Sequence, residues 1–455
     1  MIRTILYREI YDGITSFTFL SALVLLTALV PLSAYIQAQY YRQVIADYSV
    51  RQKIHEAENS AYAAVITRPV PPLLPLFNGV YDSLPDEITV RNDSATRTLS
   101  SEDLRPLDWL FPKIDLGIII GVLMTLMALL LGHDAVSGER EQGTLKLILS
   151  SPVSKNMVLV AKLMGVVGLM LISLIYTIIL YVLVLIASSG GAFALSAPRL
   201  LEITILMSIA ILTIVVFASL SVVISTMVKH SSVSLALSIS IWVATVLIWP
   251  TLGPYIAATF WPVPPRQAVQ HEMLNKEAGL IREEVSDYKR AAAELKASNT
   301  DVEVAWQRFL ELKRRWIERK KAEIGDLNAN RARQIGNQQM RVRTILSLSP
   351  YGAFTESLGT LCGTGLQSHD LFLVSAEQYE SEQFISSSFE FLAKEKPWMS
   401  RSGTAPPFEL PPFQMPMPSL SERLQGLIMP VVFLLLEIGI VLGIRFLKFA
   451  PYGVG

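Results

Sequence analysis

The chain has 455 residues, of which 51% are hydrophobic and 17% charged, and its formal net charge is zero. Soluble domains carry roughly 25% charged residues, so this composition indicates a polytopic membrane protein and gives no reason to expect nucleic acid as a partner. The single cysteine, Cys362, excludes an intramolecular disulfide and a cysteine-based structural metal site.

The first sixteen residues predict an amphipathic lead-in helix on the cytoplasmic side, residues 1–16, ahead of the first apolar run. Apolar residues recur there at helical spacing beside charged ones: Ile2, Ile5, Leu6 and Ile10 with Arg3, Arg8 and Glu9. Two interpretations stay open, a charged flank of the first membrane span and a helix that lies in the membrane interface. We expect no cleavable signal peptide, because the apolar run is long and no small-residue cleavage site ends it.

Six runs are long enough to cross a bilayer, which needs roughly 20 apolar residues per helix. The apolar runs themselves carry no charged residue apart from one acid, Glu437, in the last, and we number the spans that contain them one to six. The predicted spans are residues 17–37, 114–132, 157–187, 200–228, 232–251 and 424–446. The predicted fold is therefore a mainly α, multi-pass membrane protein.

An even number of spans places both termini on one side of the membrane, and the basic residues indicate which side. Lys and Arg gather at the termini and in the loops that share their side: Arg3, Arg8, Arg140, Lys146, Lys155, Lys162, Lys229, Arg445 and Lys448. The short loop near Gly190 offers only Arg199. We therefore expect cytoplasmic termini, with residues 447–455 as a tail, in a bacterial inner membrane.

Two long segments then face outward. Residues 38–113 are predicted to form a small, strand- and turn-rich piece. Residues 252–423 are predicted to form a large extracytoplasmic domain, with a long helical hairpin at about 268–345 and a stiff, proline-rich connector at 397–418.

The hairpin prediction depends on two apolar seams. In the first helix, steps of four and three connect Leu274, Ala278, Ile281, Val285, Tyr288, Ala292 and Leu295. Asp301 is a candidate N-cap for the second helix, whose seam holds Val302, Trp306, Phe309, Leu312 and Trp316. The basic residues between Lys313 and Lys321 are either a surface for anionic lipid or an acidic partner, or a solvated helix face, which we favour.

No covalent chemistry is evident: the sequence holds no Walker A, GxSxG or HExxH motif and no metal-ligand cluster. Asp115 is expected at a helix end. Glu437 lies deeper in the membrane, where it could line a pathway, pair with a basic residue of another subunit or stay protonated. We favour a structural, inter-helix role for Glu437 over substrate contact.

The connection between spans two and three, residues 133–156, holds most of the charge in its region, and we call it the charged loop. It reads "HDAVSGEREQGTLKLILSSPVSK" from His133 to Lys155. Ser137 is predicted to cap a short helix, Thr144 a second one, "LKLILS", and Ser154 the third span. The expected product is a compact cytoplasmic knob with its acids and Arg140 at the tip, suited to docking on another protein.

This loop resembles the signature of ABC-2-type transporter permeases. The resemblance implies a coupling helix that sits on a separate ATPase subunit, with these residues facing it: Ser137, Gly138, Glu139, Arg140, Glu141, Gln142, Gly143, Thr144 and Leu145. Lys146 stands where many relatives have an acid. The large domain between spans five and six resembles a less characterised subgroup.

The resemblance also implies partners. ATP and Mg would be bound by an ABC ATPase dimer, with no cofactor and no catalytic site on this chain. A second permease, identical or related, would complete a dimer in the lipid bilayer.

Three functions remain open. In the first, the dimer exports a substrate, with spans two and five lining the route and polar residues facing it: Thr125, Ser234, Ser238 and Ser240. In the second, the permease drives a periplasmic or envelope partner without moving a substrate. In the third, the protein is a membrane-bound enzyme or receptor unrelated to ATP, which the missing catalytic constellation and the charged loop disfavour.

Overall fold

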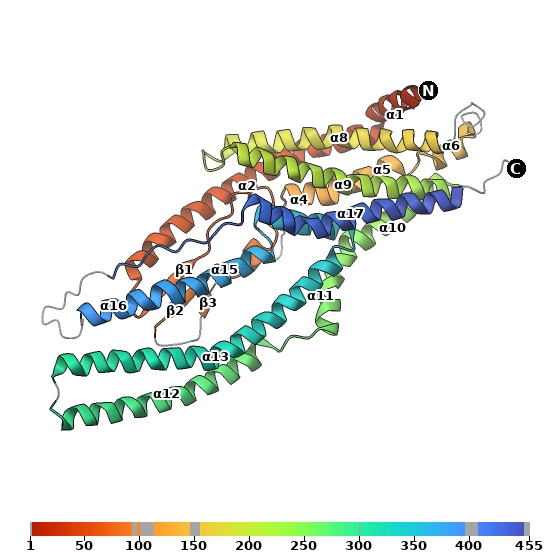
Figure 1. Cartoon of the computed structure of the whole chain (residues 1–455). Coiled ribbons are helices and arrows are strands. Elements are labelled where there is room, and N and C mark those ends of the chain that lie inside the picture. The colour runs from red at the N-terminus through yellow and green to blue at the C-terminus, as the bar shows by residue number, and fades with distance from the viewer. Residues whose placement is uncertain are drawn as a thin grey trace.

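The computed structural model describes residues 2–92, 98–100, 113–145, 155–299, 301–395 and 408–449. The molecule is elongated, with a bundle of apolar helices at one end and a long helical hairpin at the other (Figure 1). Within these described ranges, six helices are long and apolar enough to cross a membrane: Phe17–Glu58, Leu116–Glu141, Asn156–Ser188, Ala197–Met227, Ser231–Phe260 and Leu420–Gly443. The predicted mainly α fold with six spans is confirmed.

Span one begins after the lead-in helix α1 (Ile2–Thr15) and belongs to α2 (Phe17–Glu58). Ser16 caps α2, since its hydroxyl accepts a hydrogen bond from the amide of Phe19 at 3.2 Å. The helix continues past residue 37, the predicted end of the span. Its later part is rich in Ala, Gln, Arg, Lys and Glu and holds no Gly or Pro, so nothing breaks the helix where the apolar run stops.

The other spans follow in chain order. Span two consists of α4 (Leu116–Ile118), a π-helical segment (Ile119–Met124) and α5 (Thr125–Gly132), and α6 (Ser137–Glu141) comes next. Spans three and four are α8 (Lys155–Ser188) and α9 (Ala197–Met227). Span five consists of α10 (Ser231–Trp242), a π-helical segment (Val243–Ile248) and α11 (Trp249–Phe260), and span six is α17 (Leu420–Phe449).

Close packing in the bundle uses small residues. A Cβ on Gly132 of α5 would lie 3.0 Å from the side chain of Ser221 on α9. The Ser221 hydroxyl donates to the carbonyl of Leu129 at 2.8 Å. Small residues at a helix crossing let two backbones approach, which is how membrane helices gain packing energy without a hydrophobic driving force.

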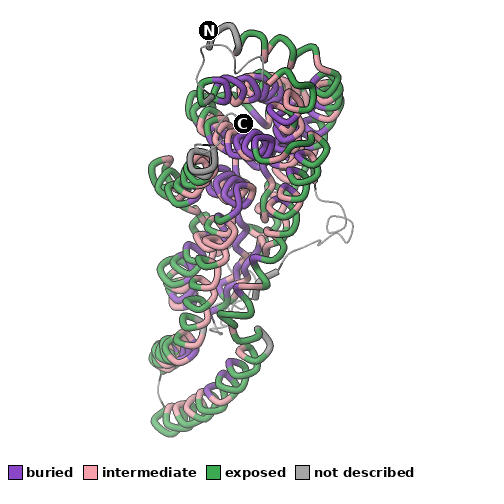
Figure 2. The backbone as a smooth tube through the Cα atoms, turned by 90° about the vertical axis from the view of Figure 1, so that its right-hand side faces the viewer, coloured by how far each residue is buried: buried purple, intermediate pink, exposed green. Residues whose placement is uncertain are grey.

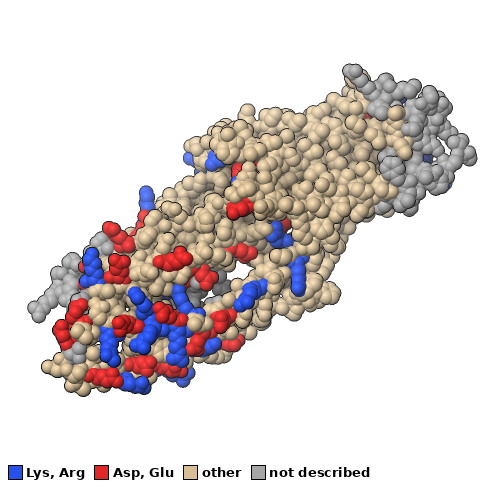
Figure 3. Space-filling view, in the orientation of Figure 1, with Lys and Arg blue, Asp and Glu red and all other residues tan. Residues whose placement is uncertain are grey.

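The bundle's outer surface is apolar. Figure 3 shows acidic and basic side chains gathered over the hairpin end and a long, largely uncharged surface over the spans. Large apolar side chains on α2, α8 and α17 are exposed there, among them Val24, Ile179, Leu183 and Leu436. A soluble surface would not expose so many, so this belt fits lipid chains.

A small sheet follows α2. The strands β1 (Ala63–Thr67), β2 (Glu87–Arg91) and β3 (Thr98–Ser100) are antiparallel in the order β1-β2-β3, with a 3₁₀ turn at Tyr81–Ser83. Its buried face packs with residues of α15 (Leu366–Tyr379) and of a π-helical segment (Glu380–Phe384), and α16 (Ile385–Glu395) follows. Residues 93–97 and 101–112 of the predicted small outward piece lie outside the described residues.

The hairpin consists of α12 (Arg266–Ala297) and α13 (Val302–Leu346). The predicted seam of the first helix is wrong by one residue at Leu274 and Ile281, because Met273 and Leu280 are the side chains that pack with Trp316 and Ile324 of α13. Tyr288 of the predicted seam does reach α13, with its ring centroid 5.1 Å from that of Phe309. Glu284 lies on the same face and pairs with Lys320. The spacing of apolar residues alone does not identify this interface, because the buried Glu284–Lys320 pair occupies part of it.

The second helix begins where it was expected. Asp301 stands at the N-cap position of α13, although its side chain makes no capping hydrogen bond. Figure 2 shows most hairpin residues exposed or half-buried, whereas buried residues concentrate in the helix bundle.

The base of the hairpin is attached to span five. The indole of Trp249 donates to the carbonyl of Ile345 at 2.8 Å, and the hydroxyl of Ser349 donates to the carbonyl of Thr245 at 2.6 Å. Next comes α14 (Pro350–Cys362), which is largely buried and packs against α9 and α17. Movement of span five therefore reaches the hairpin directly.

The proline-rich connector forms neither helix nor strand over residues 408–418. Phe413 packs edge-on against Tyr379, with ring centroids 5.4 Å apart. The connector therefore follows the surface of α15. Residues 397–407 of the predicted connector lie outside the described residues.

Candidate functional site

The charged loop lies at the same end of the molecule as α1 and the C-terminal end of α17, opposite the hairpin (Figure 1). The structure describes it as far as Leu145. The predicted second helix "LKLILS", the departure at Lys146 and the predicted cap Ser154 lie outside the described residues.

The N-terminal cap of α6 comes from another span. The prediction that Ser137 caps this helix is wrong, because Ser137 is already its first residue and its hydroxyl donates to the carbonyl of His133 at 2.9 Å. The hydroxyl of Ser225, on α9, accepts from the amides of Val136 at 3.0 Å and Ser137 at 2.9 Å. These buried amides would otherwise lack an acceptor at the helix start.

Arg140 in turn caps the C-terminal end of α9. Its guanidinium donates to the carbonyls of Val228 at 2.7 Å and Thr226 at 3.2 Å, where α9 ends. A cation is favourable at a helix C-terminus, where carbonyls lack intrahelical partners. The helices α6 and α9 thus cap each other.

Glu139 connects the loop to two further helices. Its carboxylate accepts a hydrogen bond from the ammonium group of Lys162, on α8, at 2.7 Å. The same ammonium donates to Glu9, on α1, at 2.8 Å, and Lys162 is 3% exposed. One buried cation therefore joins α1, α6 and α8.

The rest of the described loop is exposed. Residues 141–144 are exposed and Leu145 is half-buried. Glu141 lies 3.1 Å from the imidazole of His230, at the start of α10. Gly143 adopts a φ of 75°, which favours glycine and turns the chain after α6. Of the three consecutive charges predicted at the tip, only Glu141 is on the exposed surface.

Two membrane helices meet at a polar contact. The hydroxyl of Thr125 donates to the carbonyl of Gly121 at 2.6 Å and accepts from the indole of Trp242 at 3.0 Å. Thr125 directly follows the π-helical segment of span two, and Trp242 directly precedes that of span five. π-Helical turns interrupt the regular backbone ladder and often occur at functional positions.

The other polar candidates differ in placement. The side chains of Ser234 and Ser238 are fully buried, and their hydroxyls lack a hydrogen-bond partner among the described residues. Ser240 is exposed and donates to the carbonyl of Ala236 at 2.8 Å. Glu437 is half-buried, and one of its carboxylate oxygens has no partner in the described part of the chain. Thr125, Ser234 and Ser238 are thus buried within one subunit rather than exposed along a route.

Asp115 has a structural role. It caps α4 by accepting from the amide of Ile118 at 2.9 Å, and its other oxygen accepts from the amide of Asn78 at 2.9 Å. The carboxylate thereby attaches the segment between α2 and α4 to the start of span two.

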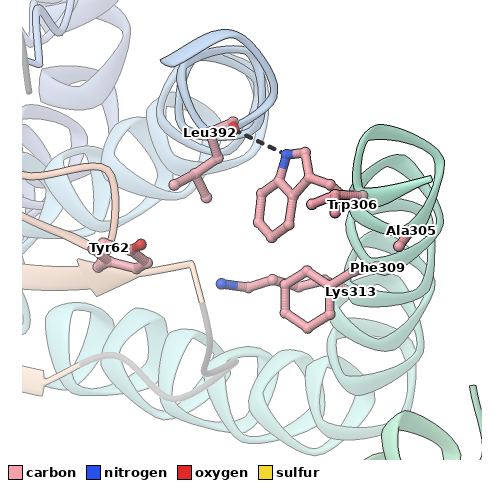
Figure 4. Close-up of a pocket in the computed structure, with 7 residues that line it drawn as sticks. Tyr62, Ala305, Trp306, Phe309, Lys313 and Leu392 are labelled. Atoms are coloured by element: carbon pink, nitrogen blue, oxygen red, sulfur yellow. Dashed lines mark hydrogen bonds between the residues drawn. The ribbon is translucent and has the colours of Figure 1, made fainter. Parts of the chain in front are cut away.

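An open pocket of about 500 Å³ lies far from the bundle. Figure 4 shows Trp306, Phe309 and Lys313 of α13 turned toward Tyr62 and Leu392. The rings of Trp306 and Phe309 stack with centroids 5.0 Å apart, and the Trp306 indole donates to the carbonyl of Leu392 at 3.2 Å. Trp306, Phe309 and Lys313 recur at helical spacing, the signal by which the sequence could have identified this face.

Residues 3–436 match the family model described as ABC-2 family transporter protein. A search of curated proteins found no match. The matched region contains the charged loop and nearly all of the six spans. Because the match covers nearly the whole length, the chain belongs to the ABC-2 family of transporter membrane proteins and is a permease, a membership that implies an ABC ATPase as partner.

Proposed function

We propose that this permease couples ATP hydrolysis by a separate ABC ATPase dimer to export of a substrate across, or out of, the bacterial inner membrane. Both termini and the charged loop face the cytoplasm, and the hairpin faces outward. Two permeases form the membrane part, and ATP and Mg bind only to the ATPase subunits.

The main support for this proposal is the attachment of the charged loop to neighbouring membrane helices. Residues 141–144 are exposed for contact with the ATPase, whereas Glu139 and Arg140 connect α6 to its neighbours. An ATPase that displaces the exposed end must therefore also displace spans three and four. A loop that only determined topology would need no buried connections.

The displacement has a route across the bundle. The Thr125–Trp242 contact joins spans two and five where each has a π-helical segment. Span five holds the hairpin through Trp249 and Ile345. A change of tilt at the cytoplasmic end is thus passed to the hairpin base.

A second candidate function is the driving of a periplasmic or envelope partner. The pocket at Trp306 favours it, because apolar walls with one cationic group suit a partner's apolar anchor. The 45-residue helix α13 leads from this pocket to the membrane bundle. Force could follow this helix without any substrate crossing.

Co-purification in mild detergent tests the proposal. We expect an ABC ATPase with the wild-type permease, its loss in Glu141→Arg, and its retention in Glu390→Arg, an exposed reversal at the outward end. A wild-type complex without an ATPase would refute the proposal. An envelope protein that leaves the complex on Trp306→Ala, while the ATPase stays, would establish the second candidate in place of export.

A further inference from the structure

The helix α12 carries two neighbouring apolar faces, and in the described part of the chain Met273 and Leu280 belong to the face that packs against α13. Met273 and Leu280, which are 8% and 4% exposed, pack against α13. The neighbouring seam is open: Leu274, Ile281 and Val285 are 50%, 43% and 44% exposed. Three large aliphatic side chains on one face of a soluble helix indicate a surface that another molecule covers.

The open seam has coiled-coil spacing. Leu274, Ala278, Ile281 and Val285 are separated by steps of four, three and four residues. The next member of the series, Tyr288, turns to α13, where its ring centroid lies 5.1 Å from that of Phe309. The alternation of four and three is the repeat that keeps a and d positions facing a second helix, with Ile281 at d and Val285 at a. The occupant is therefore a helix that lies along α12.

Charges of opposite sign flank the open seam. Glu277 and Glu284 precede Ala278 and Val285, at g positions, and both lie toward α13. At the e positions, along the other edge, Arg282 and Lys289 are exposed. One edge of the seam is thus acidic and the other basic.

We propose that the open seam of α12 binds the same seam of a second copy of this chain, with the two helices parallel. In a parallel pair each g position faces the e position five residues further along the partner. Glu277 then faces Arg282 of the second copy, and Glu284 faces Lys289 of the second copy. An antiparallel pair would instead bring acidic edges together and basic edges together.

Glu284 can accept this further contact. Its two carboxylate oxygens already accept from Lys320 and from the hydroxyl of Tyr288 at 3.0 Å. An ionised carboxylate has about four lone-pair sites, so a second cation can bind beside Lys320. A copy of α12 in the open seam would extend an existing ion pair into a network.

Membrane symmetry selects the same orientation. The two permeases of the proposed function share a two-fold axis along the membrane normal, and the inference rests on that arrangement for the direction of the hairpins. The hairpin extends away from the bundle along the long axis of the molecule (Figure 1). Two copies related by such an axis project their α12 helices in the same direction, which is the orientation that the charges favour.

Cysteine cross-linking of the full-length permease in membranes tests the inference. The background is Cys362→Ala, which removes the only native cysteine. Ile281→Cys is a d position and meets its own copy only in a parallel pair, so oxidation should give a covalent dimer. Arg290→Cys, on the opposite face of α12 with its native side chain 72% exposed, is the matched control and should stay monomeric. Equal cross-linking at both positions would show random collision and overturn the inference.

Charge reversal tests the orientation. Lys289→Glu, added to Ile281→Cys, places two acids opposite each other in a parallel pair and should lower the cross-linked fraction about threefold. In an antiparallel pair it would bring unlike charges together along the basic edges. An increase in cross-linking would therefore overturn the inference.

The same membranes separate this inference from the proposed function. Two differently tagged copies are co-expressed, and the ATPase and the second tag are both measured after capture on the first. A covalent Ile281→Cys dimer without an ATPase would refute the proposed function and support the seam. Copies that co-purify with the ATPase but form no Ile281→Cys dimer, or copies that do not co-purify, would refute the seam.

Discussion

Removal of the Lys162 ammonium should release the charged loop from the bundle. Lys162 is 3% exposed and donates to Glu9 at 2.8 Å and to Glu139 at 2.7 Å. A hydrogen bond to a charged group contributes about 1.5–3 kcal/mol, so the two bonds give about 3–6 kcal/mol before solvent compensation. The side chains of Glu9 and Glu139 are 29% and 22% exposed. Water can therefore hydrate both carboxylates once the ammonium group is gone, which offsets part of the lost hydrogen-bond free energy.

We therefore expect Lys162→Met to weaken the attachment of α6 by about 3 kcal/mol, near the lower end of the cost of breaking a buried pair. This corresponds to a roughly 150-fold fall in the ratio of attached to released loop. Folding and membrane insertion should persist, because the apolar packing of α8 against α2 and α9 is untouched.

A double-mutant cycle measures the connection. The free energy of unfolding in detergent and ATPase retention are determined for Lys162→Met, Glu139→Gln and the combination. We expect an interaction energy of about 1.5–3 kcal/mol. Arg8→Met, which breaks an exposed ion pair with Asp12 on α1, is the control and should leave both quantities unchanged. Additive effects within about 0.5 kcal/mol would refute a direct Lys162–Glu139 contact.

Three further predictions concern other contacts. Ser225→Ala leaves two buried amides of α6 without an acceptor and should cost about 1–2 kcal/mol, measured as a fall in the free energy of unfolding in detergent. Thr125→Val removes the acceptor of the Trp242 indole and should uncouple ATP hydrolysis from transport in vesicles, while unchanged coupling would contradict the route through spans two and five. Burial, and secondarily the charge of Arg68, lowers the pKa of His369 to about 4, so the folded state resists protonation. The free energy of unfolding should therefore fall by about 3 kcal/mol as the pH drops from about 6.5, the ordinary pKa of histidine, toward 4. The His369→Gln variant should lose this pH dependence in thermal melts.

The spans and the hairpin could be predicted because each depends on a local pattern. A run of about 20 apolar residues forms a helix in lipid whatever its neighbours are, since every backbone group must be satisfied within the segment. The hairpin helices show helical spacing over many turns, and Asp301 marks the start of the second. The seam of the first helix could not be chosen from sequence, because Glu284 gains a partner only when Lys320 is brought beside it.

The connections of the charged loop depend on distant residues. Ser225 is 88 positions from Ser137, and Lys162 is 153 positions from Glu9. A loop serine before two acids is read as a local cap unless the partner helix is known. The π-helical segments could not be predicted from the sequence either, since an apolar run has the same composition whether its turns are α-helical or π-helical.

The order of charges in the loop follows from helix geometry. Successive residues of an α-helix point about 100° apart, so three adjacent charged side chains reach three different neighbours. Glu139 reaches α8 through Lys162, Arg140 reaches the end of α9, and Glu141 reaches His230 at the start of α10. One short helix is thereby attached to spans three, four and five. A displacement of α6 would therefore act on all three spans, and the exposed residues 141–144 are the part of the loop that an ATPase can contact.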